Sequence, residues 1–200
     1  RTELRLQRNK EGVWSIFLPD GMYADRLVDG SLYKLHIHGD NGWNDRISAY
    51  ARRVVQDEVT KNYTSQFVID KPYEWKHDDF RAPGVGELLI YESHVGMAQE
   101  REGVGTYVEF RDEILPRIKE AGYNAVQLMA IAEHPYYGSF GYHVSSFFAP
   151  SSRFGTADEL RSLIDRAHEL GIAVIMDLVH AHYVKNFNEG INELDGSKHH

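Results

Sequence analysis

The stretch Ala173-Val174-Ile175-Met176-Asp177-Leu178-Val179-His180-Ala181-His182 decides the predicted fold. An apolar run leads into an acidic residue, and two histidines follow one residue apart. Such a run is typical of a buried parallel strand that presents polar side chains at its carboxyl end. In a (β/α)₈ barrel, the carboxyl ends of the strands form the active-site face. The sequence therefore predicts a barrel strand over 172–178, with Asp177 at the functional end.

Two further strands precede this one and alternate with helices. They are predicted over 88–91 and 125–130. A capping box follows each of them and predicts a helix start, first at Thr106–Glu109 and then at Thr156–Glu159. This alternation requires a parallel sheet with right-handed crossovers. We therefore expect residues 81–200 to be the N-terminal part of a catalytic barrel, with the first three βα units of an incomplete TIM (β/α)₈ barrel.

Glycines predict where the two helices end. Gly122 and Gly171 follow the last apolar positions of the two helical patterns, and glycine is the residue that most readily ends a helix. Pro116 lies inside the first pattern. Because proline has no N–H group to donate, a kink is predicted in this helix.

The first 80 residues have a different pattern, one of short strands. Tyr33, Leu35 and Ile37 alternate with polar residues, which is the period-two signature of a half-buried strand. The sequence therefore predicts the end of an N-terminal β-sandwich over 1–80, similar to a carbohydrate-binding module, in a multidomain protein of β plus α/β class. Other strands are predicted over 13–18, 50–55 and 66–70, a turn at 40–42 and a linker at 78–86.

Composition narrows the classes of partner. The formal net charge of −8 argues against a nucleic acid or an anionic membrane surface and is compatible with a neutral substrate. The chain has no cysteine, no apolar run long enough for a membrane helix and no visible signal peptide. We expect a cytoplasmic protein, or a plastid one if it comes from a plant.

Asp177 and the histidines after it are the first candidate site residues. Asp177 is either an active-site carboxylate or a structural partner of a helix end or an arginine. His180 and His182 would point the same way on an extended chain, which invites a metal site, although structural roles are common for histidine. No further ligand is evident at a second strand end, so we expect no metal.

The aromatic loop over 133–143 is the second candidate. It leaves the carboxyl end of the second strand and contains four aromatic residues, Tyr142 among them. It either packs its own rings together or forms a wall on which sugar rings stack. Glu92 and His94, near the end of the first strand, reach the same face, where we expect them to brace the site.

Several motifs resemble one enzyme family. Asp177–His182 resembles the first conserved region of the α-amylase superfamily (glycoside hydrolase family 13), which has the pattern Asp-x-Val-x-Asn-His after the third barrel strand. Five other stretches are similar to glycogen and starch branching enzymes of the eukaryotic type. They cover residues 46–51, 90–96, 123–134, 140–142 and 147–156. The resemblance covers nearly the whole chain, which looks like an internal fragment.

This resemblance implies a retaining glucanotransferase that cleaves α-1,4 links and forms α-1,6 branches in glycogen or starch. The partner would be an α-glucan polysaccharide such as glycogen, amylose or amylopectin. In the family, Tyr142 would stack on a sugar, His182 would hydrogen-bond it, and Asp177 would hold the catalytic arrangement. The nucleophilic Asp and the acid/base Glu are expected beyond His200, so no catalytic residue is assigned within this chain and it is expected to be inactive alone.

One position departs from the family pattern. Ala181 stands where many α-amylases have a calcium-binding asparagine, so no calcium and no cofactor is expected. Three alternatives remain open: another glycoside hydrolase of the superfamily, a metal-dependent barrel of the amidohydrolase type with a His-x-His pair, and a carbohydrate-binding module without catalysis.

Overall fold

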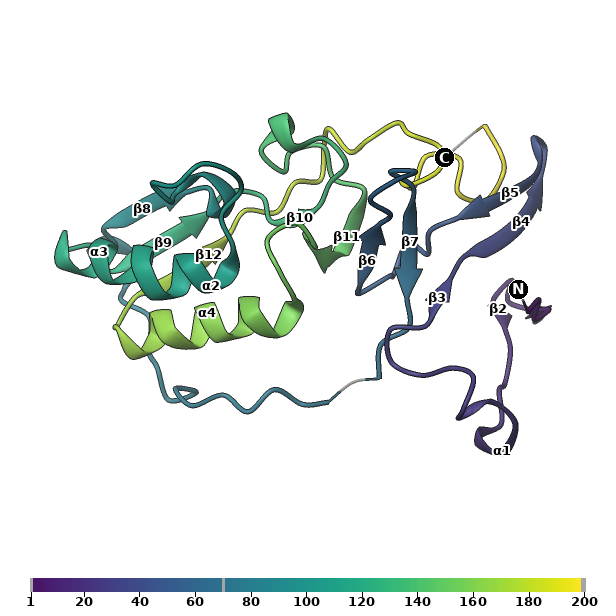
Figure 1. The fold of residues 1–200 in the computed structure, drawn as a ribbon, viewed down its shortest axis with the longest axis horizontal. Helices are drawn as coiled ribbons and strands as arrows, with labels where there is room; N and C mark the ends of the chain where they lie inside the picture. The colour runs from purple at the N-terminus through teal and green to yellow at the C-terminus, as the bar shows by residue number, and fades with distance from the viewer. Residues whose placement is uncertain (1, 70, 199–200) are drawn as a thin grey trace.

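The computed structural model of the protein describes residues 2–69 and 71–198. The short strands of the N-terminal half lie at one end of an elongated molecule, and a sheet covered by helices lies at the other end (Figure 1). Within the described residues, no helix is long and apolar enough to cross a membrane.

Three parallel strands form the sheet of the second half. They are β8 (Ile90–Ser93), β9 (Ala125–Leu128) and β12 (Ala173–Met176), in the order β12-β9-β8. Ala125 pairs with Ile90 on one side and with Ala173 on the other, so the three carboxyl ends lie at one level. The predicted parallel sheet is confirmed, although β8 begins two residues later than the sequence predicted.

The first crossover helix is irregular next to its proline. It consists of α2 (Tyr107–Glu109), a π-helical stretch (Phe110–Ile114) and α3 (Leu115–Glu120). The N–H of Leu115 bonds to the carbonyl of Phe110, five residues back, directly before Pro116. The kink predicted at Pro116 therefore takes the form of a π turn.

Both predicted capping boxes are present. Thr106 and Glu109 exchange side-chain hydrogen bonds with each other's backbone at the start of α2. Thr156 and Glu159 do the same at the start of α4 (Ala157–Glu169). Gly122 and Gly171 have φ angles of 90° and 69°, which confirms the predicted helix ends.

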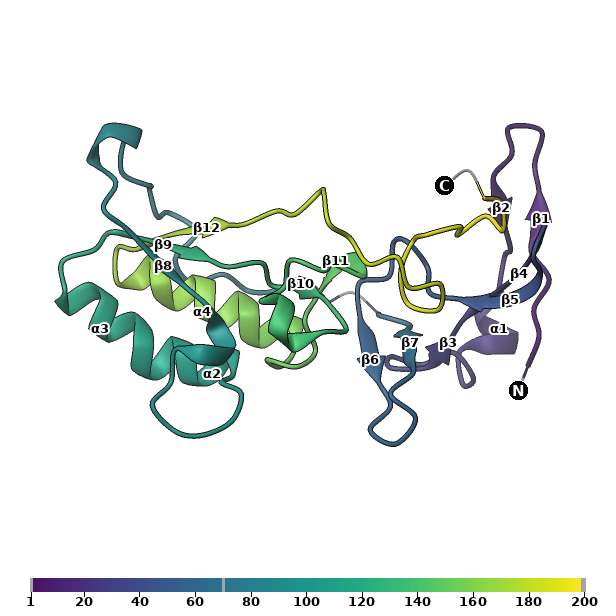
Figure 2. The ribbon, with the colours of Figure 1, turned by 90° about the horizontal axis from the view of Figure 1, so that it is seen from above.

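The crossover helices cover the same side of the sheet (Figure 2). Val126 and Leu128 of β9 are fully buried against them. The helices contribute Phe110, Ile114, Leu115, Ile118, Leu160, Leu163 and Ala167 to this core. Helices on one side of a parallel sheet are the arrangement of a barrel, whereas a doubly wound sheet has helices on both sides.

The predicted count of three βα units is not confirmed. The described residues that follow β12 contain no helix, so the third strand has no crossover of its own there. A short antiparallel pair, β10 (Ala132–Glu133) and β11 (Ser146–Pro150), was not predicted and lies between β9 and α4.

The N-terminal half is built from short antiparallel strands. Leu35 and Ile37 of β4 are half-buried while His36 and His38 are exposed, which confirms the predicted alternation. The turn at 40–41 joins β4 to β5 in a hairpin. The elements are β1 (Gln7–Arg8), β2 (Trp14–Ser15), α1 (Asp20–Tyr23), β3 (Leu32–Tyr33), β4 (Leu35–Gly39), β5 (Gly42–Arg46), β6 (Val54–Gln56) and β7 (Tyr63–Gln66).

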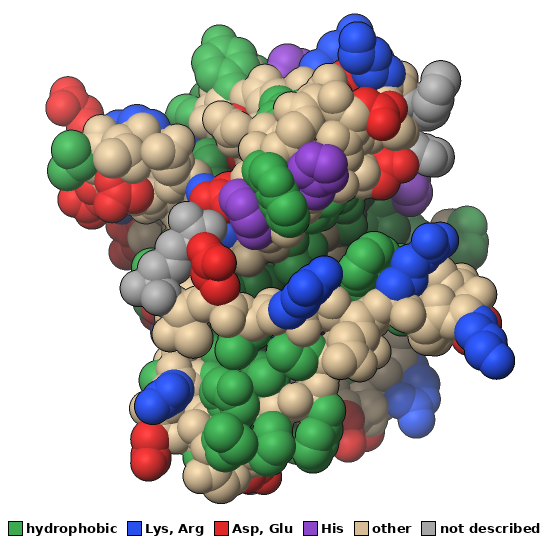
Figure 3. All heavy atoms as spheres, turned by 90° about the vertical axis from the view of Figure 1, so that its right-hand side faces the viewer, with side chains coloured by type: hydrophobic (Ala, Val, Ile, Leu, Met, Phe, Trp, Pro, Cys, Tyr) green, Lys and Arg blue, Asp and Glu red, His purple; other side chains and the backbone are tan. Residues whose placement is uncertain are grey.

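These strands form a β1-β2 pair, a β4-β5 pair and a sheet in the order β3-β7-β6. Apolar side chains remain uncovered at this end, where they gather over α1 at the bottom of Figure 3. Phe17 and Met22 are 85% and 67% exposed. The β-sandwich and the domain bounds 1–80 and 81–200 stay predictions.

Contacts join the two halves across residue 80. The segment after residue 70 runs along α4 (Figure 1), and the buried carboxylate of Asp165 accepts hydrogen bonds from the backbone N–H groups of Lys76 and His77. The ring of Phe80 stacks on that of His168 at 4.4 Å. Burial raises the pKa of Asp165, but the hydrogen bonds from Lys76 and His77 outweigh it, and the net pKa lies below the ordinary value.

Substituting Asp165→Ala should lower the free energy of unfolding by about 2 kcal/mol, because two backbone donors lose a charged acceptor. Asp158→Ala is the matched control, since it breaks only an exposed pair with Arg161 on the same helix and should cost less than about 0.5 kcal/mol.

A carboxyl group whose pKa is lower in the folded than in the unfolded protein stabilises the fold at pH values above the unfolded-state pKa. This stabilisation is lost as the pH falls. The gap between wild type and Asp165→Ala should therefore narrow below about pH 4 in thermal unfolding. Equal losses in both variants would contradict this role.

Candidate functional site

Two of the three predicted site residues meet at the carboxyl end of the sheet. The hydroxyl of Tyr142 donates a hydrogen bond of 2.7 Å to Oδ2 of Asp177. Asp177 directly follows β12, and its N–H reaches the carbonyl of Leu128 at the end of β9. The loop that leaves β9 therefore brings an aromatic ring to the acidic residue that leaves β12.

The Asp177 carboxylate also controls the proton of Tyr142. The hydrogen bond to Asp177, together with burial and the negative charges of Asp177 and Glu92, raises the pKa of Tyr142 to about 12. The phenol is protonated at neutral pH, as a tyrosine with its ordinary pKa would also be, and the shift extends this protonated, donating form to more alkaline pH. Because the bond fixes the ring orientation, one aromatic face is held in place beside a carboxylate.

A glycine allows Tyr142 to reach this place. Gly141 has a φ of 91°, and a Cβ atom built on it would lie 1.7 Å from the carbonyl oxygen of Ala130. No other residue type fits where the loop presses against the end of the second strand. The residue before it, Phe140, is also left-handed, with a φ of 55°.

Glu133 closes the base of the same loop, and the sequence interpretation gave it no such role. Its backbone carbonyl accepts hydrogen bonds from the N–H and hydroxyl of Ser145, and its carboxylate accepts one of 2.8 Å from the N–H of Ser152. Glu133 is 1% exposed, and burial raises the pKa of its carboxyl group. The available signal was an acidic residue three positions after the predicted strand 125–130, followed by serines at 145, 146, 151 and 152.

His182 is not hydrogen-bonded to this pair in the described part of the chain. It is exposed, has a φ of 66°, and forms no hydrogen bond with Tyr142 or Asp177 among the residues the structure describes. However, the N–H of Val184 donates to the carbonyl of Val144 at 3.0 Å. The chain after His182 therefore runs beside the chain after Tyr142. His180 is exposed, and no role follows from its position.

Glu92 and His94 lie near the end of β8. Oε1 of Glu92 accepts a hydrogen bond of 3.2 Å from Gln127 on the neighbouring strand. His94 is 6% exposed and lies edge-on to three rings of the aromatic loop region, which are Tyr137, Phe140 and Phe154. Burial, aided by His134, lowers the pKa of His94. Its ring is therefore a neutral group that packs under the aromatic loop and supports it from below.

The aromatic loop divides between the two roles proposed for it. The ring of Tyr137 turns inward, and its hydroxyl donates to the carbonyl of Gly96 at 2.9 Å. Tyr136, in contrast, is 62% exposed. Tyr137 therefore packs against the core beneath the loop, while Tyr136 and Tyr142 remain available at the loop surface.

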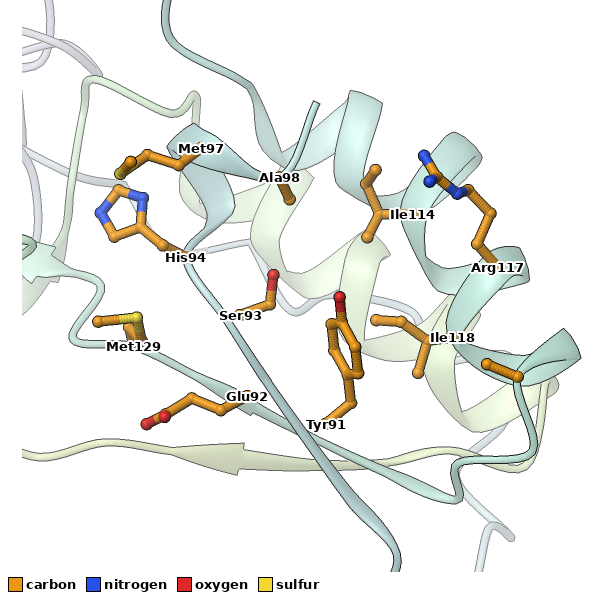
Figure 4. A pocket seen from close by; sticks show the side chains of 11 residues that line it. Tyr91, Glu92, Ser93, His94, Met97, Ala98, Ile114, Arg117, Ile118 and Met129 are labelled. Carbon is orange, nitrogen blue, oxygen red and sulfur yellow. The ribbon is translucent and has the colours of Figure 1, made fainter. Parts of the chain in front are cut away.

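A hollow of about 570 Å³ lies elsewhere, between β8 and α3. In Figure 4, Tyr91 and Ser93 point from β8 toward Ile114 and Ile118, whereas Glu92 points away. Its lining includes none of Tyr142, Asp177 and His182. Within the described residues β8 pairs only with β9, so this hollow follows an unpaired sheet edge, and its lining reaches the carboxyl end of the sheet at Glu92 and His94.

The side chains at the candidate site suit a neutral ligand rich in hydroxyl groups. An aromatic face beside a carboxylate offers stacking and hydrogen-bond acceptance together. Within residues 2–69 and 71–198, no three His, Asp or Glu side chains gather as a metal site would require.

Comparisons with known proteins agree with this chemistry. Residues 102–198 match the model of the alpha-amylase catalytic domain. The chain is 48% identical, over 98% of its length, to the 1,4-alpha-glucan-branching enzyme 2-2, chloroplastic/amyloplastic, of Arabidopsis thaliana. It is 45% identical, over its whole length, to the 1,4-alpha-glucan-branching enzyme of Dictyostelium discoideum. The chain spans 24% and 30% of these two relatives.

A solved structure shows the same fold. The pullulanase of Bacillus acidopullulyticus superposes with a TM-score of 0.72 at 22% identity, covering 92% of this chain and 25% of that one. Together these matches confirm the resemblance suggested by the sequence motifs. They do not favour the amidohydrolase alternative.

Substituting Asp177→Asn should lower the pKa of Tyr142 from about 12 toward its ordinary value, because the charged acceptor is removed. Nuclear magnetic resonance of the tyrosine ring carbons during an alkaline titration measures this pKa. Glu92→Gln is the control and should lower it less, since Glu92 contributes only through its charge. An unchanged Tyr142 pKa in Asp177→Asn would contradict the pairing.

Proposed function

We propose, from the premise that this chain belongs to the alpha-amylase family, that it is part of a 1,4-α-glucan-branching enzyme. The complete protein would cleave α-1,4 links and form α-1,6 branches in glycogen or starch. The observation that carries the proposal is the 48% and 45% identity to branching enzymes along the whole chain. The Tyr142–Asp177 pair at the sheet end supports it with suitable chemistry.

We assign three side chains to one wall of the glucan site. Tyr142 stacks on a sugar ring at the point of cleavage, and its bond to Asp177 keeps the ring in position. His182 hydrogen-bonds the same sugar and stabilises the charged transition state. Asp177 holds the arrangement together. The exposure of His182 leaves its ring free to meet a ligand.

Bond cleavage needs groups from outside this wall. A retaining transfer requires a nucleophilic carboxylate and a second carboxyl group that donates and then removes a proton. We place both beyond His200. The acceptor would be a 6-hydroxyl of a glucan chain, which takes the fragment from the nucleophile and forms the branch.

The finer architecture is also part of the proposal. We assign residues 1–80 to the end of a β-sandwich similar to a carbohydrate-binding module and residues 81–200 to the start of the barrel, with its first three strands and the two crossover helices between them. We expect neither metal nor cofactor in the reaction, and a cytoplasmic location, or a plastid one in a plant. Short antiparallel strands in the first part and parallel strands in the second support this division.

The complete protein should convert linear amylose into a product with α-1,6 links without a matching rise in reducing ends. Debranching of the product followed by chain-length analysis measures the links, and a reducing-sugar assay measures net cleavage. Reducing ends that rise without new branches would instead support a hydrolase of the same family. Residues 1–200 alone should form no branches, and detectable branching by this piece would contradict the placement of the two carboxyl groups.

In the complete protein, His182→Ala should lower kcat by about 100-fold, the loss typical when one stabilising donor is removed. Tyr142→Ala should lower it strongly as well, because the stacking face is gone. His36→Ala is the control, since His36 is an exposed histidine on β4 that contacts Asp45 and Trp43. Branching rates of folded variants test this, and wild-type rates in either site variant would remove that residue from the site.

A further inference from the structure

The guanidinium of Arg46, at the end of β5, is buried among backbone carbonyls from the far end of the chain. Arg46 is 1% exposed. Its Nη1 donates to the carbonyl of Glu193 at 2.5 Å, and its Nη2 donates to those of Asn192 at 2.5 Å and Gly190 at 3.1 Å. Its Cζ atom lies 4.2 Å from the ring centre of Phe187. One side chain therefore organises the segment 187–193, because a planar guanidinium offers five donors in a fixed fork.

The β4-β5 hairpin holds the neighbouring residues of that segment. In Figures 1 and 2 the C-terminal chain, in yellow, runs from β12 to this hairpin. Asn41 donates a side-chain hydrogen bond of 2.6 Å to the Glu193 carboxylate. The N–H of Asp40 donates to the carbonyl of Gly196, and a Cβ atom on Gly39 would lie 2.4 Å from the Cα atom of Gly196. The β4-β5 hairpin and the C-terminal segment are therefore in direct backbone contact.

A continuous line of contacts leads from Arg46 to the candidate site. Gly190, whose carbonyl Arg46 binds, packs against Val184, and a Cβ atom on Gly190 would lie 2.9 Å from Cγ2 of Val184. Val184 is 7% exposed, and its N–H bonds to the carbonyl of Val144. His182 stands two residues before Val184. The segment that Arg46 holds is therefore packed against the chain that carries His182.

We propose that Arg46 is a positioning residue for the glucan site, a role that rests on the proposed function. A buried guanidinium is costly unless it finds hydrogen-bond acceptors. Nη1 and Nη2 find theirs in the carbonyls of Gly190, Asn192 and Glu193, while Nε is buried without a hydrogen-bond partner among the described residues. Because these three bonds form only when both segments are in place, the hairpin and this segment take up their positions together. Arg46 touches no substrate. It acts through Gly190 and Val184, so the N-terminal half determines where His182 stands at the site.

The test is a double-mutant cycle in the complete protein. Arg46→Met should lower kcat for branching about tenfold, since displacing a positioned group by a fraction of an ångström carries penalties of this order. In a His182→Ala background the same substitution should change kcat less than about twofold, because the residue being positioned is gone. Arg53→Met is the control, since Arg53 forms an exposed pair with Asp29 in the same half, and it should leave kcat unchanged in both backgrounds.

Several results would overturn the proposal. A folded Arg46→Met variant with the wild-type kcat would do so, and so would effects of Arg46→Met and His182→Ala that simply multiply. If Arg46→Met does not fold, Arg46→Lys and Gly190→Ala are judged by the same criterion. Arg46→Lys keeps the charge but loses the planar arrangement of donors. Gly190→Ala keeps Arg46 and crowds Val184 and the carbonyl of Asn186.

A second readout separates this proposal from the proposed function. In protein labelled at histidine, the ring signals of His182, assigned by their loss in His182→Ala, should shift in Arg46→Met and stay in place in Arg53→Met. A wild-type protein that forms no branches would refute the proposed function, and the His182 signals would still decide the positioning role. Signals unmoved by Arg46→Met would overturn it.

Discussion

The parallel pairing on both sides of Ala125 is the constraint on which the rest of the structure depends. Because Ile90 and Ala173 both pair with this residue, β8, β9 and β12 end at the same level. Every segment that leaves a strand there begins at one edge of the sheet. The crossover helices occupy one face, which leaves the opposite face for side chains such as Glu92 and Gln127. Asp177 and the loop that carries Tyr142 start from neighbouring strand ends, and for that reason the two side chains can meet.

Buried charged side chains then hold the segments that have no regular structure. Glu133 accepts hydrogen bonds from the loop that follows β11, Asp165 accepts them from the segment beside α4, and Arg46 donates them to the C-terminal segment. Burying each charged group without a hydrogen-bond partner would cost free energy, and each loop has backbone N–H or carbonyl groups that need hydrogen-bond partners. Hydrogen bonds between the charged group and the loop backbone lower both costs, although Nε of Arg46 has no hydrogen-bond partner among the described residues. The three residues therefore tie long loops to the regular elements through hydrogen bonds.

The same arrangement explains why the proposed function divides between parts of a longer protein. The chain spans 24% and 30% of the two branching enzymes to which it was compared. In the proposed function, it would contribute a ring that stacks on a sugar, a carboxylate that orients this ring, and a histidine positioned by contacts from the N-terminal half. A transfer reaction also needs two carboxyl groups on opposite sides of the bond. In this proposal, the described residues orient the glucan, and the groups that break and form bonds come from further along the barrel.

The sequence by itself determined the elements whose signals are local. The capping boxes at Thr106 and Thr156, the helix ends at Gly122 and Gly171 and the alternation in β4 all depend on neighbouring residues, and the structure has each of them. Asp177 and Tyr142 were predicted by motif and strand position, but their hydrogen bond spans 35 residues. Only the tertiary structure decided that bond, the loop closure by Glu133 and the burial of Arg46 against Gly190, 144 residues away. No local pattern encodes such contacts, because their free energy arises only when distant segments exclude water together.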